Sequence, residues 1–328
     1  MPTIKVATPA DYDLPRDVCS YGYFVLAPNY WDTKARVLWR VFDLGQRAVL
    51  AKVSQKSRRG GSLSVWTSES LDKTEVAALR AQLTRMLCLD ETAEHLAQFH
   101  ALDPRFAASG KGRLLRSPTL FEDVIKTVTS CNVTWPGTIQ MNKRLCEVLG
   151  KRAVVAKAAP QAHAFPTPAK LARARPATLR ARCRVGYRDT RLIELARLFV
   201  LPPSRGGIDE SWLADPATPD EVVFKSLIEL PGVGPYAAAN IMQLLGRYSR
   251  LPLDTESVRH GRSVLGMKGT SAQIMKRVKQ HFEPFGAHAF RSYWFELWDM
   301  YEAKHGPSHT WERDSTGKLF TAAALNAT

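Results

Sequence analysis

Residues 230–259 read LPGVGPYAAANIMQLLGRYSRLPLDTESVR, and this stretch predicts both a local fold and a binding surface. Gly232 and Gly234 stand one residue apart between two segments with helical patterning, which is typical of a tight turn between short helices. Backbone N–H groups in the first turn of a helix have no partner within that helix and lie at the positive end of its dipole. They suit an anion such as a phosphate. Asp254 follows twenty residues after Gly234 and supplies a carboxylate.

The chain of 328 residues is strongly basic, with a formal net charge of +15. With 45% hydrophobic and 23% charged residues, it has the composition of a globular protein that is long enough for two or three subdomains. An excess of Lys and Arg favours a polyanionic partner, because neutralised phosphates release their counterions. Residues 151–200 contain twelve basic side chains, among them Arg180, Arg182 and Arg184, against two acidic ones. We interpret this segment as a phosphate-facing surface; the alternative is a solvated face.

The cysteine pattern and the N-terminus limit which cofactors and which cellular compartment we expect. The five cysteines are widely spaced and include no C-x-x-C, so we expect no zinc site, no iron–sulfur cluster and no disulfide framework. The N-terminus has no apolar signal-like region, and no run of about 18 apolar residues occurs. We therefore expect an intracellular protein without a membrane partner, located in the cytoplasm or nucleoid of a bacterium or in the nucleus of a eukaryote.

Residues 1–106 are expected to form an α+β domain. Segments rich in aromatic and β-branched residues predict three strands, at 21–28, 36–44 and 48–53. The turn residues at 55–62 then predict a β-hairpin with a further strand. From residue 71 to residue 99 the apolar period becomes that of a helix.

Residues 107–305 are expected to form a helical domain, followed by a loosely ordered tail at 306–328. Ser117 is expected to cap a helix that ends near Asn132, and Thr218 is expected to open the helical hairpin with a capping box over 218–221. The hairpin itself is expected over 219–246, with its second helix starting at Pro235, and two further helices over 272–305. The expected fold class is mainly α with an N-terminal α+β domain.

Several blocks of the sequence resemble the helix-hairpin-helix superfamily of DNA glycosylases. The blocks are RMLCLDETAEHLAQFHALDPRF (85–106), LLRSPTLFEDVIKTVTSCNVTW (114–135), FPTPAKLA (165–172), CRVGYRDTRLIELA (183–196), LPGVGPYAAANIMQLLG (230–246) and LPLDTESVRH (251–260). They are similar to the 3-methyladenine DNA glycosylase II and 8-oxoguanine DNA glycosylase branches, and the resemblance covers most of residues 20–300. It implies a base-excision repair enzyme that binds double-stranded DNA containing a damaged base and flips that base into a pocket. We expect a monomer without a cofactor.

The resemblance also implies roles for particular residues. It places a DNA phosphate at the hairpin residues Leu230, Gly232, Val233 and Gly234, often with a monovalent metal ion at the backbone of Leu230 and Gly232. Asn132 matches an asparagine that meets the vacated or opposing base. Aromatic side chains that are expected to stack on a flipped base are Trp135, Tyr187, Tyr236 and Tyr293.

Asp254 matches the catalytic aspartate of these enzymes. Breaking an N-glycosidic bond develops positive charge on the sugar, and an ionised carboxylate nearby stabilises that charge. The dipole of the following helix is expected to keep Asp254 ionised at neutral pH. The alternative is that Asp254 serves as a helix cap alone. Glu256 is the nearest competing acid and is expected to face solvent.

Tyr236 stands where bifunctional members of the superfamily carry a Schiff-base lysine. A phenol forms no imine, so the sequence predicts a monofunctional glycosylase. Electron-rich rings favour cationic bases, which makes alkylated purines such as 3-methyladenine the preferred substrate. The 8-oxoguanine branch resembles a pocket with a glutamine at the position of Tyr293, which weakens that assignment. Excision of 8-oxoguanine or another lesion, and a DNA-binding protein without catalysis, remain the alternatives.

Overall fold

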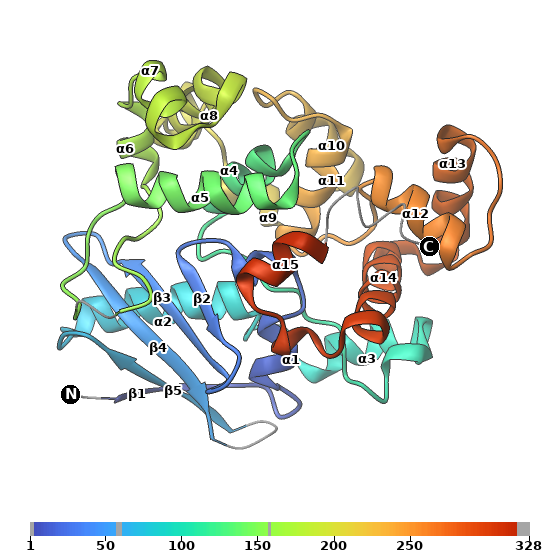
Figure 1. Ribbon diagram of the computed structural model, residues 1–328, viewed down its shortest axis with the longest axis horizontal. Coiled ribbons are helices and arrows are strands. Elements are labelled where there is room, and N and C mark those ends of the chain that lie inside the picture. The colour runs from blue at the N-terminus through green and yellow to red at the C-terminus, as the bar shows by residue number, and fades with distance from the viewer. Residues whose placement is uncertain (1–2, 57–60, 157–158, 320–328) are drawn as a thin grey trace.

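The computed structural model describes residues 3–56, 61–156 and 159–319, which form many helices and one small sheet (Figure 1). Neighbouring strands are antiparallel throughout, in the order β1-β5-β4-β3-β2. The strands are β1 (Thr3–Ala7), β2 (Asn29–Asp32), β3 (Val37–Asp43), β4 (Ala48–Gln55) and β5 (Ser62–Thr67). The predicted class, mainly α with an N-terminal α+β part, is confirmed. None of the described helices is long and apolar enough to cross a membrane.

The strand predictions are correct for β3 and β4 and wrong for residues 21–28. The hairpin between β4 and β5 is confirmed, although residues 57–60 of its turn lie outside the described part of the chain. Residues 22–25 form the 3₁₀-helix η1 (Gly22–Val25) instead of a strand. The side-chain amide of Asn29 donates to the Tyr23 carbonyl at 2.9 Å and closes this turn. Because residues 21–29 are all buried, their apolar run carries no strand-like alternation.

Helix α2 (Lys73–Leu87) covers one face of the sheet. Its Leu79 and Leu83 belong to the same buried core as Leu38 of β3 and Val53 of β4. The helical stretch predicted over 71–99 is two helices, because the chain turns at Cys88 with a left-handed φ of 52° before α3 (Ala93–Leu102) begins.

The remaining helices lie above and beside the sheet in Figure 1. They are α1 (Leu14–Val18), α4 (Leu120–Ser130), α5 (Trp135–Leu149), α6 (Pro168–Ala172), α7 (Pro176–Thr178), α8 (Asp189–Val200), α9 (Glu210–Ala214), α10 (Asp220–Ile228), α11 (Pro235–Leu244), α12 (Thr255–Ser263), α13 (Ser271–Phe282), α14 (Ala289–His305) and α15 (Arg313–Leu319). A π-helical turn, Leu179–Cys183, continues α7. The shorter 3₁₀ segments are Pro104–Phe106, Gly186–Arg188, Pro203–Arg205, Glu283–His288 and Ser308–Thr310.

Two predicted helix caps are wrong. Helix α4 is capped by Thr119, which accepts a hydrogen bond from the Glu122 N–H, while Ser117 lies buried before the helix with its N–H bonded to Asp123. Helix α10 has no capping side chain. The carbonyl of Thr218 instead accepts from Arg247, which also forms an ion pair with Asp220.

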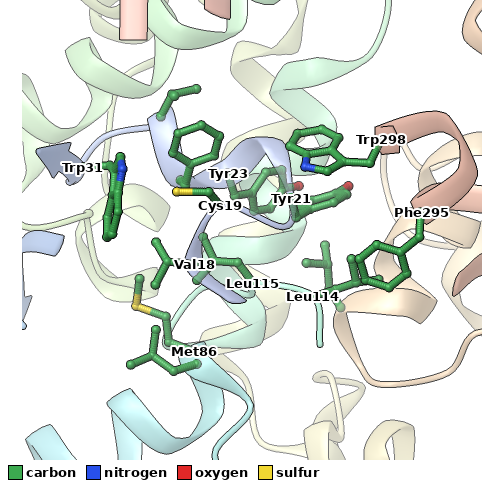
Figure 2. Close-up of a cluster of buried hydrophobic side chains, with 14 of the residues drawn as sticks. Val18, Cys19, Tyr21, Tyr23, Trp31, Met86, Leu114, Leu115, Phe295 and Trp298 are labelled. Carbon is green, nitrogen blue, oxygen red and sulfur yellow. The ribbon is translucent and has the colours of Figure 1, made fainter. Parts of the chain in front are cut away.

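Two large buried cores hold the helices and the sheet together. One contains side chains of α4, α5, α8, α10 and α11. The other joins the sheet and α2 to α13 and α14, and Figure 2 shows part of it, including Met86, Leu114, Phe295 and Trp298. The N-terminal sheet therefore shares its core with the late helices. The domain limits at residues 106 and 305 remain a prediction.

The expectation of a loosely ordered tail is wrong for residues 308–319. Helix α15 contacts α5 (Figure 1). Trp31 Nε1 donates to the His309 carbonyl at 2.8 Å, and Arg313 donates to the Asn29 carbonyl. These partners lie on or beside β2, nearly 300 positions earlier, so no local sequence pattern signals the contact. Residues 320–328 lie outside the described part of the chain.

Candidate active site

A cavity of about 280 Å³ lies where the start of α12 meets α11, α14 and the η1 turn. Its walls are mostly aromatic, and Asp254 is part of its lining. The lining residues are Tyr21, Gly22, Tyr23, Ser130, Val133, Thr134, Trp135, Tyr236, Asn240, Pro252, Asp254, Thr255, Glu256, Tyr293, Trp294, Leu297, Trp298 and Tyr301. The structure thus brings Asp254 together with three of the four aromatic residues that the sequence placed in a base pocket: Trp135, Tyr236 and Tyr293.

Asp254 is the N-cap of α12. One carboxylate oxygen accepts hydrogen bonds from the backbone N–H groups of Glu256 at 2.9 Å and Ser257 at 3.2 Å. The hydroxyl of Ser257 in turn accepts from the Asp254 N–H at 2.7 Å, which completes a reciprocal capping arrangement. Capping and a place in the cavity wall are therefore both observed for this residue, and the cap fixes the direction of the carboxylate.

Burial raises the pKa of Asp254 to about 6, and the charge of Glu256 adds to this effect. Hydrogen bonds from the start of α12 act in the opposite direction but do not outweigh burial. The helix dipole was expected to keep Asp254 ionised at neutral pH, but burial, which acts against ionisation, has the larger effect on the pKa. At pH 7 a carboxyl with this pKa is still about nine-tenths ionised.

Glu256 does not face solvent as expected. It lines the cavity and accepts a hydrogen bond from the Tyr301 hydroxyl at 2.6 Å. Arg259, one turn further along α12, forms an ion pair with it. The pKa of Glu256 is raised, because burial outweighs the effect of Arg259.

The aromatic wall contains residues that the sequence did not single out. The ring centroid of Tyr21 lies 4.8 Å from that of Trp294, and the Tyr21 hydroxyl donates to Asn240 Oδ1 at 3.0 Å. Figure 2 shows Tyr21 and Tyr23 side by side, with Trp298 nearby from α14. Aromatic enrichment of residues 282–301 hinted at the α14 side of the wall. No local sequence pattern predicted Tyr21 as part of the wall, because its contacts are with Asn240 and Trp294, more than 200 positions later in the sequence.

Tyr187 and Asn132 lie together outside the cavity. Asn132 follows the C-cap of α4 with a left-handed φ of 50°, and its amide donates to the Tyr187 hydroxyl at 3.5 Å. Tyr187 is 53% exposed and does not line the cavity, so its assignment to the base pocket is not supported. Asn132 is exposed, and the next two residues, Val133 and Thr134, do line the cavity. Asn132 therefore directly precedes lining residues in the chain but does not line the cavity itself.

The hairpin consists of α10, a turn and α11. Gly232 has a φ of 78°, a conformation that favours glycine, and the carbonyl of Leu230 accepts the Val233 N–H at 3.0 Å. Val233, predicted to bind phosphate, instead has a buried side chain and an N–H committed to this turn. Gly234 is the exposed N-cap of α11, so the donors that face outward are those at the start of α11.

The structure also gives a test of the metal expectations. No cluster of three or more His, Cys, Asp or Glu side chains suited to a metal occurs among the described residues. A backbone cation site needs carbonyl oxygens instead. The carbonyl of Leu230 keeps a second lone pair beyond its bond to Val233, so the turn is compatible with a monovalent cation at Leu230 and Gly232.

The basic segment is divided between structural and exposed side chains. Arg188 is buried and donates to the carbonyls of Val128 and Cys131 at the end of α4. Arg180 is exposed but forms an ion pair with Asp189 at 2.6 Å. Arg182 and Arg184 are exposed. Of the three arginines predicted to bind DNA, Arg180 is therefore held by an ion pair within the protein, whereas Arg182 and Arg184 are exposed.

The fold is similar to the folds of several solved DNA glycosylase structures. A 3-methyladenine DNA glycosylase from Archaeoglobus fulgidus superposes with a TM-score of 0.65 at 19% identity, covering 92% of this chain and 99% of its own. MBOgg1 in complex with a low-affinity DNA ligand gives 0.66 at 18% identity, covering 91% and 96%. The apo form of Clostridium acetobutylicum 8-oxoguanine glycosylase/lyase gives 0.61 at 16% identity, covering 85% and 93%.

No protein-family model matches the sequence, and no curated protein matches it significantly. At these identities the similarity to solved structures establishes the fold. Activity and substrate are therefore argued from the residues of the cavity.

Proposed function

We propose that this protein is a monofunctional DNA glycosylase that hydrolyses the N-glycosidic bond of a damaged base, with Asp254 as the catalytic carboxylate. The observation that carries the proposal is the position of Asp254 in the wall of an aromatic cavity, twenty residues after the second hairpin glycine. We further propose that it acts as a monomer on double-stranded DNA inside the cell.

The mechanism follows from the charge that develops on the sugar. As the bond to the base breaks, positive charge spreads over C1′ and the ring oxygen, and the ionised Asp254 stabilises it. The base leaves with the bonding electron pair. A water molecule that Asp254 orients then adds to C1′ and gives up a proton to the carboxylate, which leaves an abasic site. Flipping the base costs a few kcal/mol of unstacking, which contacts between the hairpin and the DNA backbone and stacking in the cavity offset.

Tyr236 supports the monofunctional assignment. It lines the cavity at the position where the resemblance places a Schiff-base lysine in bifunctional enzymes, and burial keeps its pKa well above the usual value for tyrosine. No lysine occurs among the described residues that line the cavity. Incubation with lesion-containing duplex and borohydride should therefore yield no covalent protein–DNA adduct. Efficient trapping would contradict this part of the proposal.

The proposed substrate is an alkylated purine. The cavity is lined by the electron-rich rings of Tyr21, Trp135, Tyr236, Tyr293 and Trp294, which attract a cationic base more strongly than a neutral one. The second candidate is 8-oxoguanine, since structures of 8-oxoguanine enzymes share the fold. Against it stands Tyr293, a ring at the position where the resemblance places a recognising glutamine.

A base-release assay over a panel of lesions tests the proposal. Duplexes containing 3-methyladenine, hypoxanthine or 8-oxoguanine are incubated with wild type and with Asp254→Asn. We expect release of 3-methyladenine by wild type and a loss of about 10²- to 10³-fold in Asp254→Asn, with DNA binding retained. The matched control is Asp209→Asn, because Asp209 caps α9 in the same way but lies outside the cavity. A wild-type protein that binds DNA but releases no base would favour the non-catalytic alternative.

A further inference from the structure

Within the described part of the chain, two carboxylates and no cationic side chain line the cavity. Among its described lining residues, the charged ones are Asp254 and Glu256. They belong to the same first turn of α12, which is capped by Asp254 itself. A flipped base in this cavity would therefore meet two acidic groups as well as aromatic rings.

Glu256 is held in place by two partners. The Tyr301 hydroxyl of α14 donates to Glu256 Oε2 at 2.6 Å, and the Arg259 guanidinium pairs with the same oxygen. The guanidinium also lies 4.7 Å from the centroid of the Tyr301 ring. Tyr301 lines the cavity and Arg259 does not. This arrangement fixes the carboxylate at the cavity surface and keeps its cationic partner outside the lining.

We propose that Glu256 is a specificity-determining residue, a second carboxylate held by Tyr301 and Arg259 that makes the cavity favour cationic bases over neutral ones. The inference rests on the proposed glycosylase function and deepens it. An N-alkylated purine carries a positive charge that interacts favourably with Glu256 in a partly desolvated site. Hypoxanthine and 8-oxoguanine are neutral and gain nothing from this charge.

Glu256 is also the charged neighbour of Asp254. The other titratable groups around Asp254 come from four separate segments of the described chain: Tyr21, Cys131, Tyr236 and Tyr293. Burial raises the pKa of each of these groups, so all four are neutral at pH 7. Removal of the Glu256 charge should therefore lower the pKa of Asp254. This gives a readout that a purely structural role of Glu256 would not produce.

The experiment compares wild type with Glu256→Gln, whose amide keeps the shape of the side chain and can still accept from Tyr301. Single-turnover rates are measured on duplexes with 7-methylguanine, a cationic base, and with hypoxanthine. We expect the ratio of the two rates to fall by about tenfold. We also expect the acidic limb of the pH profile to move to lower pH.

Arg259→Met should change the ratio of the two rates in the opposite direction. It leaves the Glu256 charge uncompensated while keeping an apolar contact with Tyr301. The rate ratio should rise, and the acidic limb should move to higher pH. Glu147→Gln is the control for loss of one negative charge, since Glu147 is half exposed on α5 and lies outside the cavity. It should change neither the ratio nor the pH profile.

The outcomes separate the two proposals. If wild type releases no base from any lesion, the glycosylase assignment itself fails. If wild type is active but Glu256→Gln keeps both the rate ratio and the pH profile, the role of Glu256 is overturned and the glycosylase assignment stands. Circular dichroism spectra and unfolding temperatures of the variants identify any change that comes from misfolding. If Glu256→Gln misfolds, Arg259→Met tests the role of Glu256, because its rate ratio should rise and its acidic limb should move to higher pH.

Discussion

At the scale of single residues, Asp254 combines a structural and a chemical role. Its carboxylate caps α12, yet burial in the cavity wall raises its pKa to about 6. A carboxyl whose pKa is higher in the folded than in the unfolded protein stabilises the fold while it is protonated. That stabilisation is fully present below about pH 4 and is lost as the pH rises through about 6.

Removal of this charge should therefore stabilise the protein at neutral pH. We expect Asp254→Asn, whose amide oxygen can still cap α12, to raise the free energy of unfolding at pH 7 by about 1–3 kcal/mol. Denaturant unfolding of wild type and variant at pH 7 and pH 4 measures the effect. The gain should shrink at pH 4, where the wild-type carboxyl is protonated. A variant less stable than wild type at pH 7 would mean that capping outweighs burial.

The same pKa predicts the pH dependence of catalysis. Because the sugar cation is stabilised by the ionised form, the single-turnover rate should decline as the pH falls through about 6. Rates between about pH 4.5 and 8 on one lesion test this. A profile that stays flat down to pH 5 would show that Asp254 titrates lower than its burial indicates.

At the scale of elements, the hairpin turn depends on Gly232. This glycine has a left-handed φ of 78°, and a Cβ there would come 2.9 Å from Arg191 Cδ. Gly232→Ala should lose about 1 kcal/mol of stability from the backbone strain and should weaken binding to undamaged duplex. Gly206→Ala is the matched control, with a φ of 82°, open space around it and a place outside the hairpin. Equal affinity of the two variants for DNA would show that the hairpin turn does not contribute to phosphate binding.

The sequence predicted elements with strong local signals and missed those defined by distant contacts. The hairpin helices, the two C-terminal helices and the β3–β4–β5 meander were found, because apolar periodicity and turn residues mark them. The η1 segment was predicted to be a strand. Because all of its residues are buried, its sequence lacks the alternation of apolar and polar residues that distinguishes a strand from other apolar segments. Helix caps were misplaced where an arginine or a buried aspartate side chain forms the hydrogen bond instead, as Arg247 does with the Thr218 carbonyl.

The candidate site shows the same division. Asp254, Trp135, Tyr236 and Tyr293 were predicted and lie together, although their roles in catalysis and base binding remain predictions. Tyr21, Trp294 and Glu256 were missed or misplaced. Their positions in the wall come from packing between segments that are far apart in the sequence, which no motif encodes.

At the scale of the whole molecule, the net charge of +15 predicts that the affinity for DNA depends strongly on salt concentration. The logarithm of the affinity should fall with the logarithm of salt concentration, with a slope of about −0.9 for each phosphate contacted. Arg182→Gln with Arg184→Gln should make the slope shallower by up to about 1.8, since both side chains are exposed. Arg180→Gln should have a smaller effect, because Arg180 pairs with Asp189. Titrations between about 50 and 200 mM salt measure the slopes, and an unchanged slope in the double variant would assign the two arginines to solvent.

The cavity wall runs from Tyr21, near the beginning of the chain, to Tyr301, near its end, and includes Trp135 and Asp254 between them. A chain that ends before α14 would carry Asp254 but would lack the side of the wall that Tyr293, Trp294 and Tyr301 form. The end of the hairpin would also lose core contacts, because Leu244 and Tyr248 share a buried core with Phe290 and Tyr293 of α14. The cavity therefore closes only when segments from residue 21 to residue 301 are all in place.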